Sequence, residues 1–159
     1  MITIDELMTP NPFTLSGNDS LDDARNIMTE KHIRHIPIAD SDKQLIGLVT
    51  QRDVLEATVP GSEQQGNRDN IKLSEIMIQN VSVLHQTDSV RQAALYLQTH
   101  KFGCLPVVSD EGLVGIITDS DFIDIAINLL EQVEISEDVA DIESDLMDDI
   151  ELPVIEDEV

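Results

Sequence analysis

The sequence predicts an α+β protein that contains two similar β-α-β-β-α units in pseudo-twofold tandem, followed by an acidic C-terminal tail. Three observations predict this class: an internal repeat, short apolar runs that alternate with helical patterns, and a late change in charge. Residues 6–56 align with residues 75–124 at a spacing of 69, which becomes 68 after a one-residue deletion in a loop. The identical pairs include Glu6 and Glu75, Met8 and Met77, Asp19 and Asp88, Pro37 and Pro106, Gly47 and Gly115, Thr50 and Thr118, and Asp53 and Asp121. Such a doubling predicts two units packed face to face, so any site between them should occur twice.

Each unit is expected to run strand, helix, strand, strand, helix after a short acidic helical turn. The first long helix of each unit is marked by an Asp-Ser pair that precedes apolar residues at helical spacing, as N-cap residues do. Two short apolar strands then form a hairpin, and the second of them leads into the last helix. In the two copies the helical turns are 5–8 and 74–77, the opening extended pieces 12–15 and 81–84, the helix starts 19–21 and 88–90, the hairpin strands 36–38 with 45–49 and 105–108 with 113–117, and the last helices begin near 53 and 121.

Composition sets the expected boundaries. Residues 57–73 contain a Pro-Gly pair and many polar residues, which is typical of a connection between two units. We therefore expect a first unit at 1–58, a linker at 59–73, a second unit at 74–130 and a tail at 131–159. A unit of about 50 residues buries too little surface to be stable alone, so the two units are expected to share a core.

Negative charge is concentrated in the tail. The net charge is −23, and residues 131–159 hold 13 acidic residues and no lysine or arginine, which leaves 19 acids against 9 bases in residues 1–130. This composition is typical of a mobile, solvated segment. Apolar residues nevertheless recur there every three or four positions, which predicts an amphipathic helix, and both descriptions stay open. The apolar positions are Ile135, Val139, Ile142, Leu146 and Ile150.

The acidic balance argues against several partners. Binding to nucleic acid or to an anionic membrane surface requires cationic residues, so neither is expected. No apolar run approaches the roughly 20 residues that a membrane-spanning helix needs, and the first residues show no secretory signal. Cys104 is the single cysteine, so no intrachain disulfide can form. The cytoplasm is the expected compartment, and the thiol is expected to be a buried packing group.

Residues suited to catalysis or metal binding are not grouped in the sequence. The four histidines are scattered, and none forms a metal-spaced pair with Cys104. The patterns GxSxG, HExxH and GxxxxGK[ST] do not occur. We therefore expect neither an enzyme nor a metal site. A cation site formed by Asp145, Asp148 and Asp149 of the tail stays as an alternative, because hard cations prefer carboxylate oxygens.

The repeated element that can carry chemistry is the junction between the last strand and the last helix of each unit. It reads GLVTQRD over residues 47–53 and GIITDSD over residues 115–121. The glycine allows a ligand or a neighbouring backbone to approach closely. Thr50 and Asp53 stand three apart at a helix start, where they can cap free amide groups. The same carboxylate can instead accept ribose hydroxyls while free helix N–H groups face a phosphate, and the residues alone leave both roles open.

The doubled pattern resembles a tandem pair of cystathionine-beta-synthase (CBS) domains, also called a Bateman module, over about residues 2–130. The resemblance is carried by LMTP at 7–10, DSL at 19–21, RHIPI at 34–38, and the junction with Gly47, Thr50 and Asp53. The second copy keeps these signals in weaker form. No single motif is specific, but the ordered set, present twice, is.

The resemblance implies a free-standing, non-catalytic regulatory module for energy sensing. It would bind AMP, ADP, ATP or S-adenosylmethionine in clefts between the repeats, need no cofactor, form a homodimer and signal to an unknown partner in trans. In this family the junction Thr and Asp hold the ribose, residues after the opening turn flank the base, and basic residues before the hairpin meet phosphate. Carried over, the ribose residues are Thr50, Asp53, Thr118 and Asp121, the base residues are Thr9, Asn11, Pro12, Phe13, Ile78, Asn80, Val81 and Ser82, and the phosphate residues are Arg34, His35 and Arg52.

The two copies differ in their basic residues. Where the first has Arg34-His35, the second has Gly103-Cys104, and Ser120 stands in place of Arg52. A phosphate needs cationic donors in so acidic a chain, so the first cleft is expected to prefer phosphorylated ligands. Lys101 and His100 could partly compensate if they point inward. The rival hypothesis is a ligand-free interaction or scaffold protein that works through its acidic tail.

Overall fold

We describe the protein from a computed structural model, in which residues 2–59 and 71–148 are described, with 137–148 as backbone only. Contacts divide the chain into two units, Met1–Asp121 and Phe122–Val159. The first unit contains both sequence repeats and all the strands of the described residues. No helix in the described ranges is both long enough and apolar enough to pass through a bilayer.

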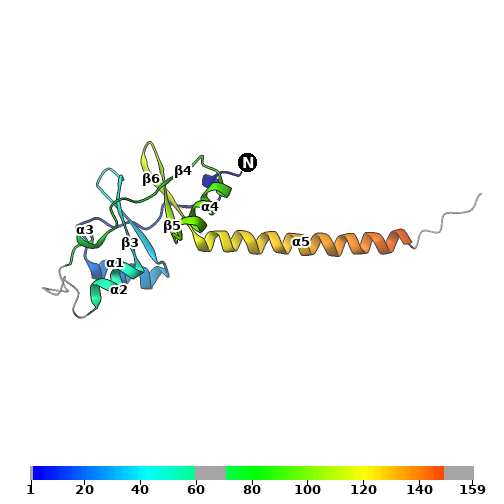
Figure 1. Ribbon diagram of the computed structural model, residues 1–159, viewed down its shortest axis with the longest axis horizontal. Helices are drawn as coiled ribbons and strands as arrows, with labels where there is room; N and C mark the ends of the chain where they lie inside the picture. Colours follow the sequence, from blue (N-terminus) through cyan, green and yellow to red (C-terminus); the bar gives the residue numbers. More distant parts are fainter. Residues whose placement is uncertain (1, 60–70, 149–159) are drawn as a thin grey trace, which may run out of the picture. The chain divides into compact units, whose positions relative to one another are not determined.

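Each repeat of the first unit folds in the same order (Figure 1). The first contains η1 (Ile4–Glu6), β1 (Thr9–Pro10), α1 (Leu21–Lys31), β2 (His35–Ala39), β3 (Leu45–Thr50) and α2 (Gln51–Thr58). The second contains α3 (Leu73–Ile76), β4 (Leu84–His85), α4 (Val90–His100), β5 (Cys104–Ser109), β6 (Gly112–Thr118) and the start of α5 (Asp119–Asp148). The predicted α+β class with two equivalent units is confirmed.

Helix α1 shows how local sequence sets these elements. The Ser20 hydroxyl accepts a hydrogen bond from the Asp23 N–H at 3.2 Å, and the Asp23 carboxylate accepts one from the Ser20 N–H at 2.9 Å, a complete capping box. The helix ends where His32 takes a left-handed conformation with φ 54°. Its buried face consists of Leu21, Ala24 and Met28.

The opening strands are the one part of this order that differs from the prediction. Strand β1 lies at Thr9–Pro10, before the expected extended piece at 12–15, and β4 begins only at Leu84. Asn11 has a φ of 48°, which ends β1, and Pro12 has no N–H to donate to a ladder. Leu15 instead makes an isolated parallel bridge to Ile38.

The segment that opens each repeat pairs with the other repeat. We call residues 2–13 and 71–82 the leading segments. Strand β1 pairs antiparallel with β6, so Thr9 lies opposite Ile116 and the four-stranded sheet has the order β1-β6-β5-β4. The equivalent contact is the bridge between Leu48 of the β2-β3 hairpin and Ile78. The pseudo-twofold relation predicted from the repeat therefore rests on exchanged segments.

The same exchange joins the cores. Leu73 donates its N–H to the Asp19 carbonyl at 2.9 Å, and Ile4 donates to the Asp88 carbonyl at 3.0 Å. Ile71 and Leu73, from the end of the predicted linker, are buried in one hydrophobic cluster with residues of the first repeat. The expected shared core is confirmed, and it explains how two small units reach a stable size.

The second unit consists of the rest of helix α5. Residues 122–148 are helical, so the predicted tail 131–159 is a helix as far as Asp148. Several large apolar side chains are exposed between residues 123 and 135, and Ile135 is 63% exposed. Residues 149–159 and the side chains of 137–148 lie outside the description, and with them the alternative cation site at Asp145, Asp148 and Asp149.

Candidate functional site

The repeated glycine at each junction lies against the leading segment of the other repeat. A Cβ at Gly47 would come 2.5 Å from Sδ of Met77 and 3.0 Å from the Ile78 carbonyl oxygen. A Cβ at Gly115 would likewise collide with Met8. Of the two explanations open at the sequence level, the close approach of a neighbouring chain segment accounts for the glycine. Its consequence is that each junction faces the other repeat's leading segment.

Thr50 and Asp53 form the capping box at the start of α2. The Asp53 Oδ2 atom accepts hydrogen bonds from the Thr50 N–H at 2.7 Å and from the Thr50 hydroxyl at 2.8 Å. In the second copy, Asp121 Oδ2 accepts from the Thr118 N–H at 2.6 Å and from its hydroxyl at 3.0 Å. The capping role is therefore present in both copies.

Capping leaves chemistry available on the same side chain. Among the described residues, both hydrogen bonds accepted by the Asp53 carboxylate end on Oδ2, and Oδ1 accepts none. A carboxylate oxygen held at a helix start and free of partners can accept a ligand hydroxyl. The two roles considered from the sequence are compatible in this geometry.

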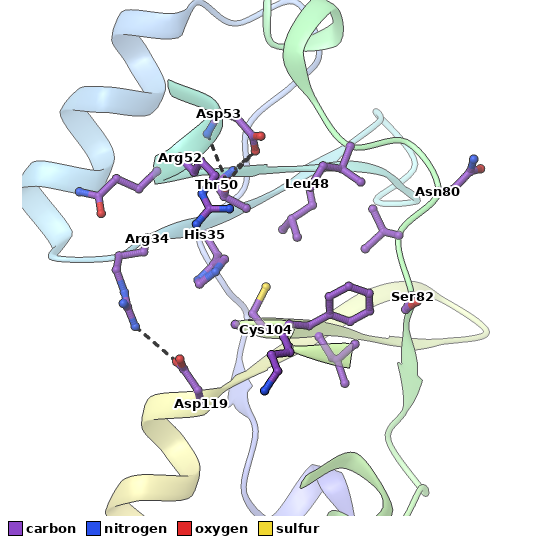
Figure 2. Close-up of a pocket in the computed structure, with 17 residues that line it drawn as sticks. Arg34, His35, Leu48, Thr50, Arg52, Asp53, Asn80, Ser82, Cys104 and Asp119 are labelled. Carbon is purple, nitrogen blue, oxygen red and sulfur yellow. Dashed lines mark hydrogen bonds and ion pairs between the residues drawn. The ribbon is translucent and has the colours of Figure 1, made fainter. Parts of the chain in front are cut away.

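The first cleft is a cavity of about 510 Å³. It combines the junction of the first repeat with the leading segment of the second, as Figure 2 shows. The predicted site residues that line it are Arg34, His35, Thr50, Arg52, Asp53, Ile78, Asn80, Val81 and Ser82. Asp119, at the start of α5, also lines this cavity and was not predicted from the sequence.

The second cleft is a cavity of about 260 Å³ on the equivalent pairing of segments. It combines the junction of the second repeat with the leading segment of the first. The predicted site residues that line it are Thr9, Pro12, Phe13, Arg34, His35, Thr118 and Asp121. Asn11 is exposed and is not among the lining residues of either cavity. His32 and Ser120 line the second cleft without having been assigned to it.

Cationic groups gather at the first cleft. Arg34, Arg52 and Lys101 line it, so Lys101 adds a cation to the first cleft and not to the second, for which it was expected to compensate. His100 stacks on Tyr96 at 4.1 Å between ring centroids. Figure 2 shows the Arg34 guanidinium directed toward Asp119, at 3.3 Å from Nη2 to Oδ1. Three cations around one cavity in a chain of net charge −23 form a local site for an anion.

His35 occupies the space next to a glycine. A Cβ at Gly103 would lie 2.8 Å from Nε2 of His35, so only glycine leaves room for the ring. Burial lowers the pKa of His35 below its ordinary value, and the charge of Arg34 lowers it further, while Asp119 and Asp53 oppose the shift. The imidazole is therefore mainly neutral at pH 7 without a ligand.

Cys104 lines the first cleft but is a poorly reactive thiol. It is buried, and burial raises the pKa of its thiol to about 12. A thiol that holds its proton so firmly is a poor nucleophile. The expectation of a buried packing cysteine is confirmed.

The arrangement offers several groups that can bind a small molecule. Within the described residues, each cleft has a carboxylate oxygen that accepts no hydrogen bond, backbone at a helix start and apolar side chains, and the first adds three cations beside Asp53 and Asp119. Within residues 2–59 and 71–136, no group of three or more His, Cys, Asp or Glu side chains could hold a metal ion. A flat apolar group, a hydroxylated sugar and an anionic group would each find a partner in the first cleft.

Comparison with known proteins identifies the family of the chain. The family model for the CBS domain matches residues 4–59 and 73–128. The chain therefore belongs to the CBS domain family, as a tandem pair of such domains. A CBS domain-containing protein of Dictyostelium discoideum is 32% identical over 139 residues, which cover 83% of this chain and 96% of that protein.

Solved structures of similar proteins agree with this family assignment. A Vibrio cholerae protein that carries the name acetoin utilization protein (AcuB) is 45% identical, with a TM-score of 0.75, and the match covers 84% of this chain and 96% of that chain. The CBS domain pair of protein MJ0100, in complex with 5-methylthioadenosine and S-adenosylmethionine, is 26% identical, with a TM-score of 0.69, over 80% of this chain and 98% of that chain. CBSX2, in complex with AMP, is 26% identical, with a TM-score of 0.71, over 81% of this chain and 98% of that chain.

Longer relatives contain this pair as a part. Homoserine O-acetyltransferase of Methanococcus vannielii is 32% identical over 111 residues, but the chain spans only 22% of that enzyme. In this chain the CBS domain model accounts for residues 4–59 and 73–128. The likeness therefore concerns the CBS pair and does not extend the enzyme's activity to this chain.

Proposed function

We propose that the protein is a regulatory module that binds an adenosine-containing ligand in the clefts between its repeats. The observation that carries the proposal is the first cleft, where a partner-free carboxylate oxygen of Asp53 stands beside three cations and an apolar wall. Two structural neighbours of more than 25% identity bind such ligands. MJ0100 is in complex with 5-methylthioadenosine and S-adenosylmethionine, and CBSX2 is in complex with AMP. This chemistry supports AMP, ADP, ATP and S-adenosylmethionine as the ligands to test.

In the proposed binding mode, each group of the ligand meets a different element. Asp53 and Thr50 hold the ribose from the start of α2, and Asp121 and Thr118 do the same in the second cleft. The leading segments flank the base, with Ile78, Asn80, Val81 and Ser82 in the first cleft and Thr9, Pro12 and Phe13 in the second. Arg34, His35 and Arg52 meet the phosphate, with Lys101 as a further donor, so phosphorylated ligands prefer the first cleft.

The proposed output is a change in the arrangement of the repeats that another protein detects. A ligand can drive such a change only if it binds one arrangement more tightly than the other. The exchanged leading segments supply a physical connection. Ile78 lines the first cleft and bridges Leu48 of the β2-β3 hairpin, and Met77 packs against Gly47 of the same hairpin. We further propose that the module acts as a cytoplasmic homodimer, with domains at 1–58 and 74–130 around a linker at 59–73, and regulates a partner in trans.

A second candidate function rests on the acidic tail. Residues 131–159 carry 13 acids and no base, and a scaffold could dock this segment onto a basic partner without any nucleotide. The two candidates differ in which part of the chain works. Removal of residues 131–159 would leave nucleotide binding intact under the first and abolish partner binding under the second.

Isothermal titration calorimetry tests the proposal directly. AMP, ADP, ATP and S-adenosylmethionine are titrated into the wild type, Asp53→Ala and Asp121→Ala. Loss of the tighter binding step for a phosphorylated ligand in Asp53→Ala, and its retention in Asp121→Ala, would support the assigned first cleft. No heat from any ligand, with folding confirmed by circular dichroism, would contradict the proposal and favour the scaffold.

A further inference from the structure

The two clefts share lining residues near the start of β2. Arg34 and His35, at the start of β2, line both the cavity at Thr50 and Asp53 and the cavity at Thr118 and Asp121. The same two residues therefore line both clefts.

The second repeat does not duplicate this segment. The positions equivalent to Arg34 and His35 are Gly103 and Cys104, which carry no cation. Gly103 has no side chain and instead leaves room for the His35 ring. The repeat thus supplies two clefts, each with its own ribose carboxylate, but a single guanidinium at the position between them.

The guanidinium of Arg34 is free to be redirected. Its ion pair with Asp119 is long, at 3.3 Å, and the two side chains are 57% and 50% exposed. Exposed ion pairs of this kind contribute little to stability, because solvent screens them. A phosphate in either cleft can therefore displace Asp119 as the partner of Arg34 at small cost, since charge-assisted contacts to phosphate are stronger and can be bidentate.

We propose that Arg34 serves both clefts in turn, so that a phosphorylated nucleotide bound in one cleft weakens the binding of a second phosphorylated nucleotide in the other. This inference rests on the proposed function and specifies its regulation. The first ligand engages the guanidinium, and the second must bind without it. A nucleoside without phosphate has no anionic group for Arg34 to bind, so two such molecules bind independently. The coupling is reciprocal, because either cleft can be filled first.

The expected size follows from one charged contact. A hydrogen bond to a charged group contributes enough that its loss weakens binding by about tenfold or more. Arg52 and Lys101 remain at the first cleft when Arg34 turns away, whereas the second cleft retains only His32 and His35. The first cleft should therefore fill first with AMP, and the second should show the penalty.

Calorimetry with AMP and with adenosine on the full chain measures the coupling. The affinity of the second cleft is taken from the weaker step of the wild type and compared with the single site left in Asp53→Ala. For AMP, the site in Asp53→Ala should be about tenfold or more tighter than the weaker wild-type step, because the first cleft no longer engages Arg34. For adenosine, the two values should agree. In Arg34→Ala, and in Arg34→Ala combined with Asp53→Ala, they should agree for AMP as well.

Four results would overturn the inference. Coupling of equal size for adenosine would show that phosphate is not involved. Coupling that persists in Arg34→Ala would show that the phosphates repel each other directly. Two AMP molecules that bind independently, each lost with its own aspartate, would leave the proposed function standing and refute only the shared cation. No binding of AMP or adenosine by any variant would refute both. Arg34 is exposed, so its variant should fold, which circular dichroism verifies.

Discussion

Gly47 of strand β3 lies against Met77, at a distance that leaves no room for a side chain on the glycine, and Gly115 stands in the same relation to Met8. Each contact joins a hairpin of one repeat to the leading segment of the other. The leading segments in turn carry Ile78, Val81, Pro12 and Phe13 to the clefts. The glycines therefore influence the clefts through packing, and neither is among the residues that line them.

Replacement of Gly47 by alanine should destabilise the protein. Met77 is flexible and can move, but the Ile78 carbonyl is held by the Leu48 N–H at 2.9 Å and cannot. Overpacking of this kind costs about 1–3 kcal/mol, which urea denaturation would detect. Gly17→Ala is the matched control, because its Cβ would meet Ser74 at an ordinary 3.4 Å. Equal stability of the two variants would contradict the close packing at Gly47.

The two capping boxes separate a structural role from a binding role. Ser20 with Asp23 and Thr50 with Asp53 share the same hydrogen bonds, but only the second pair lines a cleft. Both Asp23→Ala and Asp53→Ala should be less stable than the wild type, the latter by about 1 kcal/mol. Only Asp53→Ala should also lose the tighter AMP site, that of the first cleft, in calorimetry. Loss of this site in both variants would indicate a general structural effect.

The capping box of α1 should also respond to acid. Hydrogen bonds from the Ser20 hydroxyl and then from its backbone N–H lower the pKa of Asp23 below its ordinary value. The stability that this carboxylate contributes is present above its unfolded pKa and is lost as the pH falls through its folded pKa. Urea denaturation from pH 6 downward should therefore show the gap between wild type and Asp23→Ala closing as the pH falls. A gap that stays constant would contradict the shift.

Binding of AMP should be accompanied by the uptake of a proton at His35. Burial, aided by Arg34, holds the pKa of this imidazole below its ordinary value, and a phosphate nearby would raise it. Calorimetry at pH 7.5 in buffers of different ionisation enthalpy should show uptake of a fraction of a proton by the wild type and less by His35→Gln. Adenosine serves as the control without phosphate. Equal uptake by the two proteins would remove His35 from the phosphate site.

The same shift affects the stability of the ligand-free protein. Because folding lowers the pKa of His35, the unfolded chain binds more protons in the window below about pH 6.5. The free energy of unfolding should fall as the pH decreases through that window, and more steeply for the wild type than for His35→Gln.

Cys104 should resist thiol reagents in the folded protein. With the pKa raised to about 12 from a reference value of 9.0, its thiolate fraction at pH 8 is smaller by about 1,000-fold, and burial slows access further. Labelling with a chromogenic disulfide should be slow in buffer and rapid in denaturing urea. Rapid labelling without urea would show that the site is open.

Local rules explain why much of the fold could be predicted. Ser20 and Thr50 are typical N-cap residues, and the apolar spacing after them marks α1 and α2, so the element order follows from the repeat. The junction residues Thr50, Asp53, Thr118 and Asp121 were identified for the same reason, since their positions are fixed by neighbours in sequence.

Long-range pairing explains what could not be predicted. Nothing in the local pattern states that Thr9 lies opposite Ile116 while Ile78 bridges Leu48. The repeated glycines at 47 and 115 were the available signal, but a glycine in a strand is compatible with a ligand as well as with a chain segment. Asp119 was missed because its relation to Arg34 spans 85 residues of sequence.

The most direct test of the account is the contact between Asp53 and the ribose. The test uses Asp121→Ala, which should remove binding at the second cleft. In this background, calorimetry compares AMP with 2′,3′-dideoxyAMP, first with Asp53 intact and then with Asp53→Ala. We predict that Asp53 makes AMP bind about tenfold or more tighter than its dideoxy analogue, and that Asp53→Ala binds both with the same low affinity. Equal affinities when Asp53 is present, or a preference for AMP that survives Asp53→Ala, would contradict the assignment of the ribose to this carboxylate.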